Sequence, residues 1–181
     1  MTAFEFFTVL LSFVVSLGVA SLLLAVSRLI QEAPRVHFSL TWALWAAAVF
    51  SLQIVFWFRS WTYHDNFAIK TATSLPPLVL AIIAFIACGL ATPQTPDTGP
   101  IDLREFHAKQ GRKYQIGYAA FMLVAIVQGA LMNDTTGISY GSFLDDAVVL
   151  ATLALIAIAA AIFRRQRWLQ IGAPIVFLVS S

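Results

Sequence analysis

The sequence has very few charged residues. Only 11% of its 181 residues are charged, whereas 60% are hydrophobic. A soluble domain averages about 25% charged residues, so this chain could not cover a water-facing surface around its own core. We therefore predict that lipid solvates most of it. The net charge of +2 is small and gives no reason to expect a nucleic-acid partner.

The sequence also lacks a second cysteine and a secretory signal. Cys88 is the only cysteine, which excludes an internal disulfide and a thiolate metal cluster. The N-terminus has no basic region, and Glu5 stands where a cleaved signal would carry positive charge. We therefore expect the first apolar run to be retained in the protein.

Residue patterns that carry chemistry are missing as well. No ionisable side chain lies firmly in the middle of an apolar run, where pumps and proton relays usually place one. The sequence contains no phosphate-binding loop and no HExxH motif. The three histidines, His37, His64 and His107, lie in loops or at the ends of runs. We therefore predict no catalytic residue, metal site or cofactor, but we expect bound lipids.

What the sequence does contain is a series of apolar runs. A bilayer core about 30 Å thick needs about 20 apolar residues in a helix. Five runs are close to this length, and a sixth is shorter. They cover residues 4–29, 40–60, 73–91, 114–132, 146–163 and 169–181. The sequence thus predicts an all-α transmembrane bundle over residues 1–181, with five full spans and a partial or truncated sixth.

The basic residues are concentrated in alternate gaps between these runs. The second gap contains Arg59 and Lys70, and the fourth contains none. The first, third and fifth gaps contain nine: Arg28, Arg35, Arg104, Lys109, Arg112, Lys113, Arg164, Arg165 and Arg167. Cytoplasmic loops carry the excess of Lys and Arg. We therefore predict that the odd gaps are cytoplasmic and the N-terminus is outside, in a bacterial inner membrane.

Polar and aromatic residues within the runs indicate how the helices pack. Ser12 and Ser16 share one face of the first run, and small faces let helices approach closely in lipid. Gln53 and Gln128 are amides in apolar runs, so they should face other helices or line a polar path. Tryptophan and arginine at the ends of runs are predicted interfacial anchors. These anchors are Trp42, Trp45, Trp57, Trp61, Arg164 and Arg165.

Acidic residues mark two predicted helix starts. Asp102 and Glu105 have the spacing of a capping box, with Asp in place of Ser or Thr. This pattern predicts a helix that starts at Leu103 and can run into the fourth span. Asp145 and Asp146 stand at the start of the fifth run and are expected to cap it, because an acid complements the dipole at a helix N-terminus.

These patterns favour a non-catalytic membrane subunit that scaffolds, assembles or regulates a larger complex. Its expected partners are the lipid bilayer and other membrane subunits or further copies of the chain. One alternative is a channel or carrier for a small or neutral solute, lined by amide and serine side chains that include Ser51. Another alternative is a haem-binding protein or intramembrane enzyme that uses a histidine.

Overall fold

The computed structural model describes residues 3–61, 71–96, 99–136, 140–164 and 166–180, without the side chains of residues 3–4, 71–74, 132–136 and 140–143. This part of the chain is nearly all helical, as predicted. Its α-helices are α1 (Ala3–Gln31), α2 (Leu40–Ser60), α3 (Thr71–Ala91), α4 (Leu103–Thr136), α5 (Tyr140–Ile162) and α6 (Arg167–Ser180).

Four helical segments are long and apolar enough to cross a membrane. These segments are Glu5–Gln31, Leu40–Ser60, Leu103–Leu131 and Leu144–Ile162. The described parts of α3 and α6 provide shorter apolar helices, Leu75–Ala91 and Arg167–Ser180. The predicted count of five full spans, and the outside N-terminus, therefore stay predictions.

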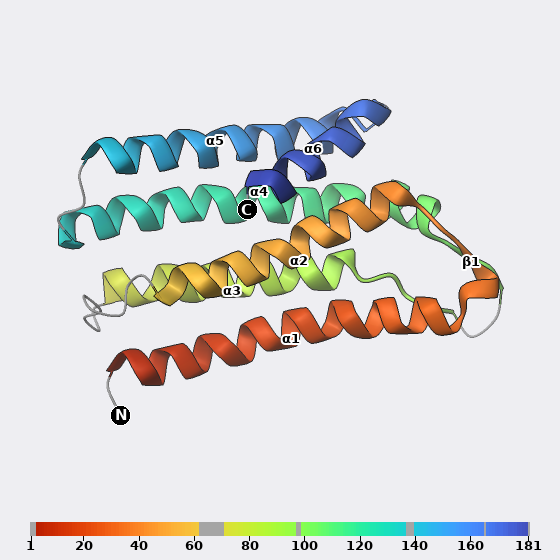
Figure 1. Cartoon of the computed structure of the whole chain (residues 1–181), viewed down its shortest axis with the longest axis horizontal. Coiled ribbons are helices and arrows are strands. Elements are labelled where there is room, and N and C mark those ends of the chain that lie inside the picture. Colours follow the sequence, from red (N-terminus) through yellow and green to blue (C-terminus); the bar gives the residue numbers. More distant parts are fainter. Residues whose placement is uncertain (1–2, 62–70, 97–98, 137–139, 165, 181) are drawn as a thin grey trace.

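The helices lie side by side and run alternately up and down the bundle (Figure 1). α4 packs most extensively against α3 and α5, and α1 packs mainly against α3. α2 contacts α1, α3 and α4, while α6 contacts α2 and α5. Because α6 has 14 residues, it is only about 21 Å long. It therefore fills the space beside α2 and α5 along only part of the bundle, and its last residue lies near the middle (Figure 1).

A short parallel pairing joins two loops at one end of the bundle. β1 (Val36–His37) follows α1, and β2 (Ile101–Asp102) precedes α4. Val36 pairs with Ile101, and His37 pairs with Asp102. We call this the strand end of the bundle, and the opposite end the far end. The described ends of the first, third and fifth gaps, which hold most of the basic residues, all lie at the strand end (Figure 1).

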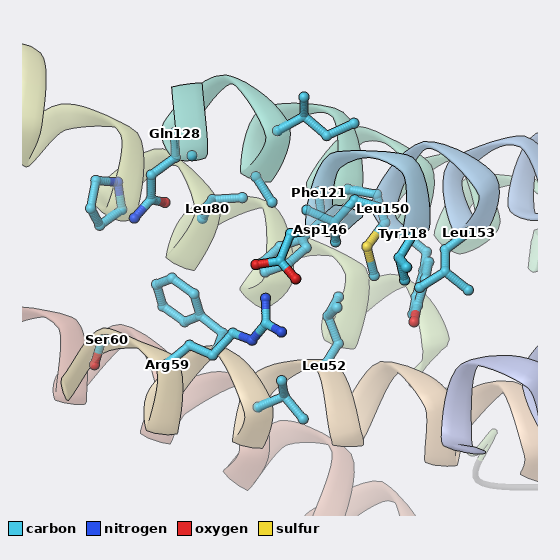
Figure 2. A pocket seen from close by; sticks show the side chains of 18 of the residues that line it. Leu52, Arg59, Ser60, Leu80, Tyr118, Phe121, Gln128, Asp146, Leu150 and Leu153 are labelled. Carbon is cyan, nitrogen blue, oxygen red and sulfur yellow. The ribbon is translucent and has the colours of Figure 1, made fainter. Parts of the chain in front are cut away.

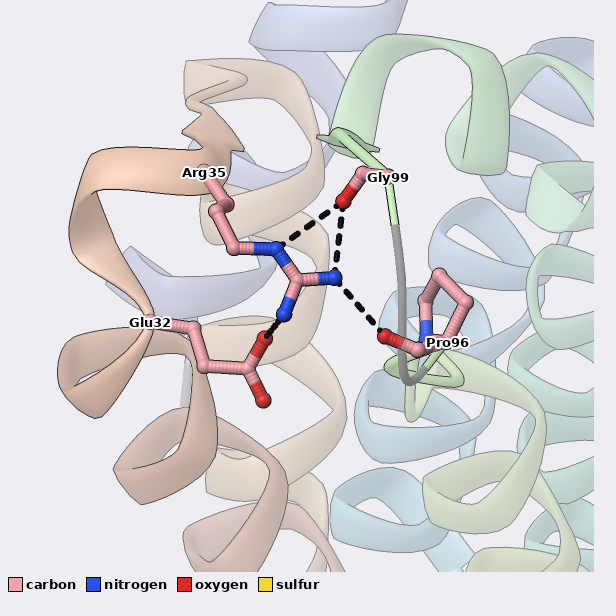
Figure 3. A network of polar contacts seen from close by, with 4 residues as sticks. All are labelled: Glu32, Arg35, Pro96 and Gly99. Carbon is pink, nitrogen blue, oxygen red and sulfur yellow. Dashed lines mark hydrogen bonds and ion pairs between the residues drawn. The ribbon is translucent and has the colours of Figure 1, made fainter.

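Arg35 ties the same two loops together through its guanidinium group (Figure 3). Its Nε and Nη2 atoms donate to the carbonyl oxygen of Gly99 over 3.0 and 2.8 Å. Nη2 also donates to the Pro96 carbonyl over 2.9 Å, and Nη1 forms an ion pair with Glu32 over 2.9 Å. Gly99 has a φ of 96°, a conformation that favours glycine. The arginine therefore fixes the chain that leads from α3 into β2.

The predicted start of α4 at Leu103 is confirmed. The Asp102 carboxylate accepts hydrogen bonds from the backbone N–H groups of Arg104 and Glu105, over 2.8 and 3.1 Å. These bonds satisfy donors that the first helical turn leaves without intrahelical partners. The Glu105 side chain pairs with Lys109 over 2.6 Å. α4 then continues without a break into the apolar segment, as the sequence predicted.

The prediction that Asp145 and Asp146 cap α5 is wrong. α5 begins at Tyr140, so both acids lie inside the helix. A capping residue needs a non-helical backbone, which neither of them has. The prediction failed because a glycine shortly before an apolar run is typical of a turn. Gly141 instead lies within α5, so the helix begins before the two acids.

We expect Asp102 to make stability depend on pH in the acid range. Hydrogen bonds from the backbone N–H groups of Glu105 and Arg104 lower the pKa of Asp102 below its ordinary value of 3.8. The stabilisation is therefore complete above pH 3.8 and is lost as the pH falls through the lower, folded-state pKa. Asparagine caps helices without titrating. Thermal melting in a mild detergent should show that Asp102→Asn loses less stability than the wild type between about pH 5 and pH 2. Equal losses would contradict the assignment.

Candidate functional site

A cavity of about 190 Å³ lies in the far half of the bundle (Figure 2). Its walls come from the far ends of α1, α2, α3, α4 and α5, and the end of α6 contributes Phe177 and Ser180. We call it the far cavity. Most of its lining is apolar, including Phe56, Phe121 and Leu153. For comparison, an engineered cavity of about 150 Å³ lined by apolar side chains binds benzene.

A few polar side chains stand among these apolar walls. Arg59 comes from α2 and Asp146 from α5, and their charged groups point toward one another (Figure 2). Gln128 comes from α4 and is only 6% exposed. Its Oε1 atom has no hydrogen-bond partner in the described part of the chain. A buried acceptor without a partner costs about 1–3 kcal/mol, so Gln128 is a candidate for contact with a ligand.

Three aromatic rings close the far cavity toward the middle of the bundle. Tyr118 of α4 stacks on Phe177 of α6, with ring centroids 4.3 Å apart and planes 15° apart. Trp45 of α2 meets both rings edge-on, at 6.3 Å from Tyr118 and 5.5 Å from Phe177. All three side chains are buried. We call Trp45, Tyr118 and Phe177 the aromatic layer.

Trp45 also donates a hydrogen bond to a backbone carbonyl of α6 that lacks its usual donor within the helix. Pro174 lies inside α6 and has no N–H with which to bond the carbonyl of Gln170, one turn earlier. The indole Nε1–H of Trp45 donates to that carbonyl instead, over 3.1 Å. The proline thus leaves the Gln170 carbonyl without its usual helical donor, and Trp45 supplies one. This bond anchors α6 to α2 next to the aromatic layer.

The Gln170 side chain organises a buried polar network on the strand-end side of the layer. Its Nε2 donates to the Ala160 carbonyl of α5 over 2.6 Å. Its Oε1 must therefore accept, and it lies 2.7 Å from Gln115 Nε2 and 3.1 Å from His107 Nε2. This places the imidazole proton of His107 on Nε2, so Nδ1 accepts from the Tyr114 hydroxyl. The network joins α4, α5 and α6.

A second cavity, of about 620 Å³, lies beside this network toward the strand end. His107, Gly111 and Gln115 line it from α4, and Arg164 and Gln170 line it from the other side. We call it the strand-end cavity. Gln115 is buried, and its Oε1 has no partner among the described residues. This is the same condition as that of Gln128 in the far cavity.

One face of α4 connects the two cavities. Residues spaced by three or four positions share a helix face, and His107, Gly111, Gln115, Tyr118 and Met122 have that spacing. The first three line the strand-end cavity, and the last two line the far cavity. α6 repeats the order, with Gln170, Phe177 and Ser180. The two cavities therefore lie along the same face of α4, and Tyr118 and Phe177 of the aromatic layer line the far cavity at its inner end.

The polar residues singled out from the sequence lie in different surroundings. Gln53 is fully buried, and its Nε2 lies 3.6 Å from the Sγ of Cys88 on α3. It is absent from the lining of both cavities described above. Ser12 is half-buried and donates to the Thr8 carbonyl over 2.7 Å, while Ser16 is exposed on α1. Of these four residues, Gln128 is the one that lines either of the two cavities described above.

The four tryptophans that were predicted to be interfacial anchors differ in how deeply they are buried. Trp42 and Trp45 are buried in the bundle, and Trp42 donates to the Ala91 carbonyl over 3.0 Å. Trp57 is half-buried and Trp61 is exposed, and their rings meet edge-on at 6.2 Å. Trp57 and Trp61 thus lie at the periphery near the far end of α2, whereas the other two occupy interior positions.

The arginines predicted to be anchors and the three histidines do not lie together at one site. Arg164 is exposed and lines the strand-end cavity, whereas Arg165 and His64 lie outside the described residues. His37 is exposed on β1, and both ring nitrogens of His107 are occupied by the polar network. The described residues contain no group of three or more His, Cys, Asp or Glu side chains that could hold a metal ion.

Tyr118, Gln115 and Gln170 are not among the residues predicted from the sequence. For the α4 residues a signal exists, because they lie on the helix face that begins at His107. For Gln170 the signal is Pro174 four residues later, which leaves the Gln170 carbonyl without its helical donor.

Comparison of the chain with protein families, with characterised proteins and with solved structures finds no match.

Proposed function

We propose that this protein is a non-catalytic carrier for a small molecule without net charge, embedded in a bacterial inner membrane with its N-terminus outside. The observation that supports this function is the pair of cavities on one face of α4, separated by a single aromatic layer. Carriers hold a central site that opens to one side at a time. Two cavities on one path, closed from each other, have the geometry that such a cycle needs.

The charges along the path favour a cargo without net charge. Among the described residues, Arg59 and Asp146 are the charged side chains that line the far cavity, and Arg164 is the one that lines the strand-end cavity. The aromatic layer between the cavities has none, and a net charge in an apolar interior is expensive unless it is paired. Amide oxygens on both sides of the layer, from Gln128 and Gln115, can accept hydrogen bonds from such a cargo.

α6 is the element best suited to move. It carries Phe177, one of the rings of the aromatic layer, and it contains Gly172 and Pro174. Both residues weaken a helix. A shift of α6 would unstack Phe177 from Tyr118 and join the two cavities. The movement needs no change in the longer helices that frame the path.

We expect removal of the aromatic layer to turn the carrier into a leak. In proteoliposomes, the double variant Tyr118→Ala/Phe177→Ala should raise glycerol permeation several-fold, because loss of both rings joins the cavities. Osmotic swelling in a stopped-flow instrument measures the flux. The matched control is Phe13→Ala/Phe58→Ala, which removes two rings that are exposed on the outside of the bundle. A folded double variant that leaks no more than this control would contradict the path.

The scaffold or accessory-subunit role stays a second proposal. The observation that favours it is the position of Ser16 and Ala20 on the exposed face of α1, away from the other helices. Small residues let a neighbouring transmembrane helix approach closely. Co-purification from native membranes in mild detergent is the test of this role.

A further inference from the structure

We propose that the far cavity binds a small aromatic molecule with one hydrogen-bond donor, of which phenol is the simplest example. The proposal rests on the proposed carrier function and deepens it, because it names the chemical class of the cargo. Three features of the far cavity support it: its volume, the aromatic side chains in its walls, and a buried amide oxygen that has no partner among the described residues.

The volume of the far cavity suits a single ring. An apolar cavity of about 150 Å³ holds benzene, and the far cavity measures about 190 Å³. The difference leaves room for a small substituent such as a hydroxyl group, but not for a long alkyl chain. Arg59 and Asp146 are both exposed, and a ligand of this size needs contact with neither of these charged side chains.

The walls favour an aromatic ring over an aliphatic one. Phe56 of α2 and Phe121 of α4 both line the cavity, and their rings meet edge-on, with centroids 5.8 Å apart and planes 89° apart. Aromatic rings attract one another in edge-on and offset arrangements, beyond the contribution of the area they bury. Met122 also lines the cavity, and a thioether makes favourable contacts with ring edges. An aromatic guest therefore gains contacts here that an aliphatic guest lacks.

Gln128 supplies a hydrogen-bond acceptor in this apolar space. Its side chain is only 6% exposed and extends from α4 toward α2 in the view of Figure 2. Among the described residues, four buried amide oxygens have no partner, and that of Gln128 is the one that belongs to the far-cavity lining. A ligand hydroxyl or ring N–H can donate to this oxygen. Removal of the cost of an unpaired buried acceptor favours the binding of such a donor.

Fluorine NMR titration of the protein in neutral maltoside micelles tests the need for a donor. The ligands are para-fluorophenol and para-fluorotoluene, which have almost the same size but differ in the hydroxyl group. Each ligand is compared between the wild type and Gln128→Leu, so that its partition into micelles cancels from the ratio of the two dissociation constants. We expect Gln128→Leu to raise the Kd of para-fluorophenol about ten-fold, because leucine accepts no hydrogen bond. The Kd of para-fluorotoluene should stay nearly unchanged.

Gln110→Leu is the matched control. Gln110 lies on the same helix, and its Oε1 also has no partner among the described residues, but it is absent from the lining of both cavities. Its replacement should leave both dissociation constants unchanged. The proposal is overturned by a wild type without saturable binding of para-fluorophenol, or by Gln128→Leu losing both ligands equally. The same loss in Gln110→Leu as in Gln128→Leu would also overturn it.

Competition with cyclohexanol tests the aromatic part of the proposal. Cyclohexanol has the hydroxyl group and a ring of similar size but no π system. We expect it to displace para-fluorophenol from the wild type several-fold more weakly than phenol does. Equal displacement by the two alcohols would show that the walls do not select an aromatic ring.

A pair of phenylalanine substitutions tests the location of the ligand. Ala125 lines the far cavity, so Ala125→Phe should occupy part of the space and abolish the binding of para-fluorophenol. Ala130 is exposed on the same helix and is absent from the lining, so Ala130→Phe should bind like the wild type. Binding that survives unchanged in Ala125→Phe would place the ligand outside the far cavity.

The outcome is separable from that of the carrier function. If para-fluorophenol binds as expected but the Tyr118→Ala/Phe177→Ala variant does not leak, the binding site stands and the path fails. If that variant leaks but Gln128→Leu does not distinguish the two ligands, the path stands and a cargo held by the Gln128 oxygen is excluded.

Discussion

Replacement of Gly18 by valine is expected to destabilise the bundle strongly, whereas the same replacement at Gly89 should have little effect. A Cβ atom on Gly18 would lie 2.3 Å from Nε2 of Gln53 and 3.4 Å from the Cα of Phe85. Both helical neighbours of α1 therefore approach it at this residue. A Cβ on Gly89 would meet no atom within 4 Å.

The cost at Gly18 is large because Gln53 cannot move into water. Its side chain is fully buried, so valine must displace an amide within a packed apolar contact. Overpacking of a core costs about 1–3 kcal/mol, and loss of the contact to Cys88 adds to it. We expect a clear fall in melting temperature, measured by circular dichroism in maltoside micelles.

A double variant identifies the cause. Gly18→Val combined with Gln53→Ala should recover part of the lost stability, because the smaller side chain makes room for valine. If Gly18→Val and Gly89→Val melt at the same temperature, the close approach of α1 to α2 and α3 does not contribute to the stability of the bundle.

Local signals in the sequence account for most of the fold. Long apolar runs predict the helices, and Asp102 predicts where α4 begins, because a cap depends only on neighbouring backbone groups. The pairing of β1 with β2 could not be predicted in this way. Each strand has two residues, too few for a pattern, and the pairing depends on loops far apart in the sequence.

The candidate site was predictable only in part. Gln128 is visible in the sequence as an isolated amide in an apolar run, which needs a polar contact in lipid. Trp45 was interpreted as an interfacial anchor because it lies near the end of its run. Its inward direction depends on the rotation of α2 and on the unbonded carbonyl that Pro174 leaves at Gln170. Such pairings arise from helix packing, which a single sequence does not specify.

Replacement of Gln170 by leucine is the second change from which we expect a large effect. The amide of Gln170 bonds to three partners: the Ala160 carbonyl, Gln115 and His107. Leucine has a similar size but leaves these groups unpaired in the interior. Each buried group without a partner costs about 1–3 kcal/mol, and the costs need not add. α6 should detach from α4 and α5 at a lower temperature than the rest of the bundle melts.

Gln166→Leu is the matched control, because Gln166 is exposed at the rim of the same cavity. Thermal melting should separate the two variants clearly, with Gln166→Leu close to the wild type. If Gln170→Leu melts like the control, the network does not hold α6. In that case the packing of α6 against α2 and α5, together with the bond from Trp45, would hold Phe177 in the aromatic layer. A stable α6 without the Gln170 amide would thus mean that the contacts of the aromatic layer, and not the polar network, hold α6 in place.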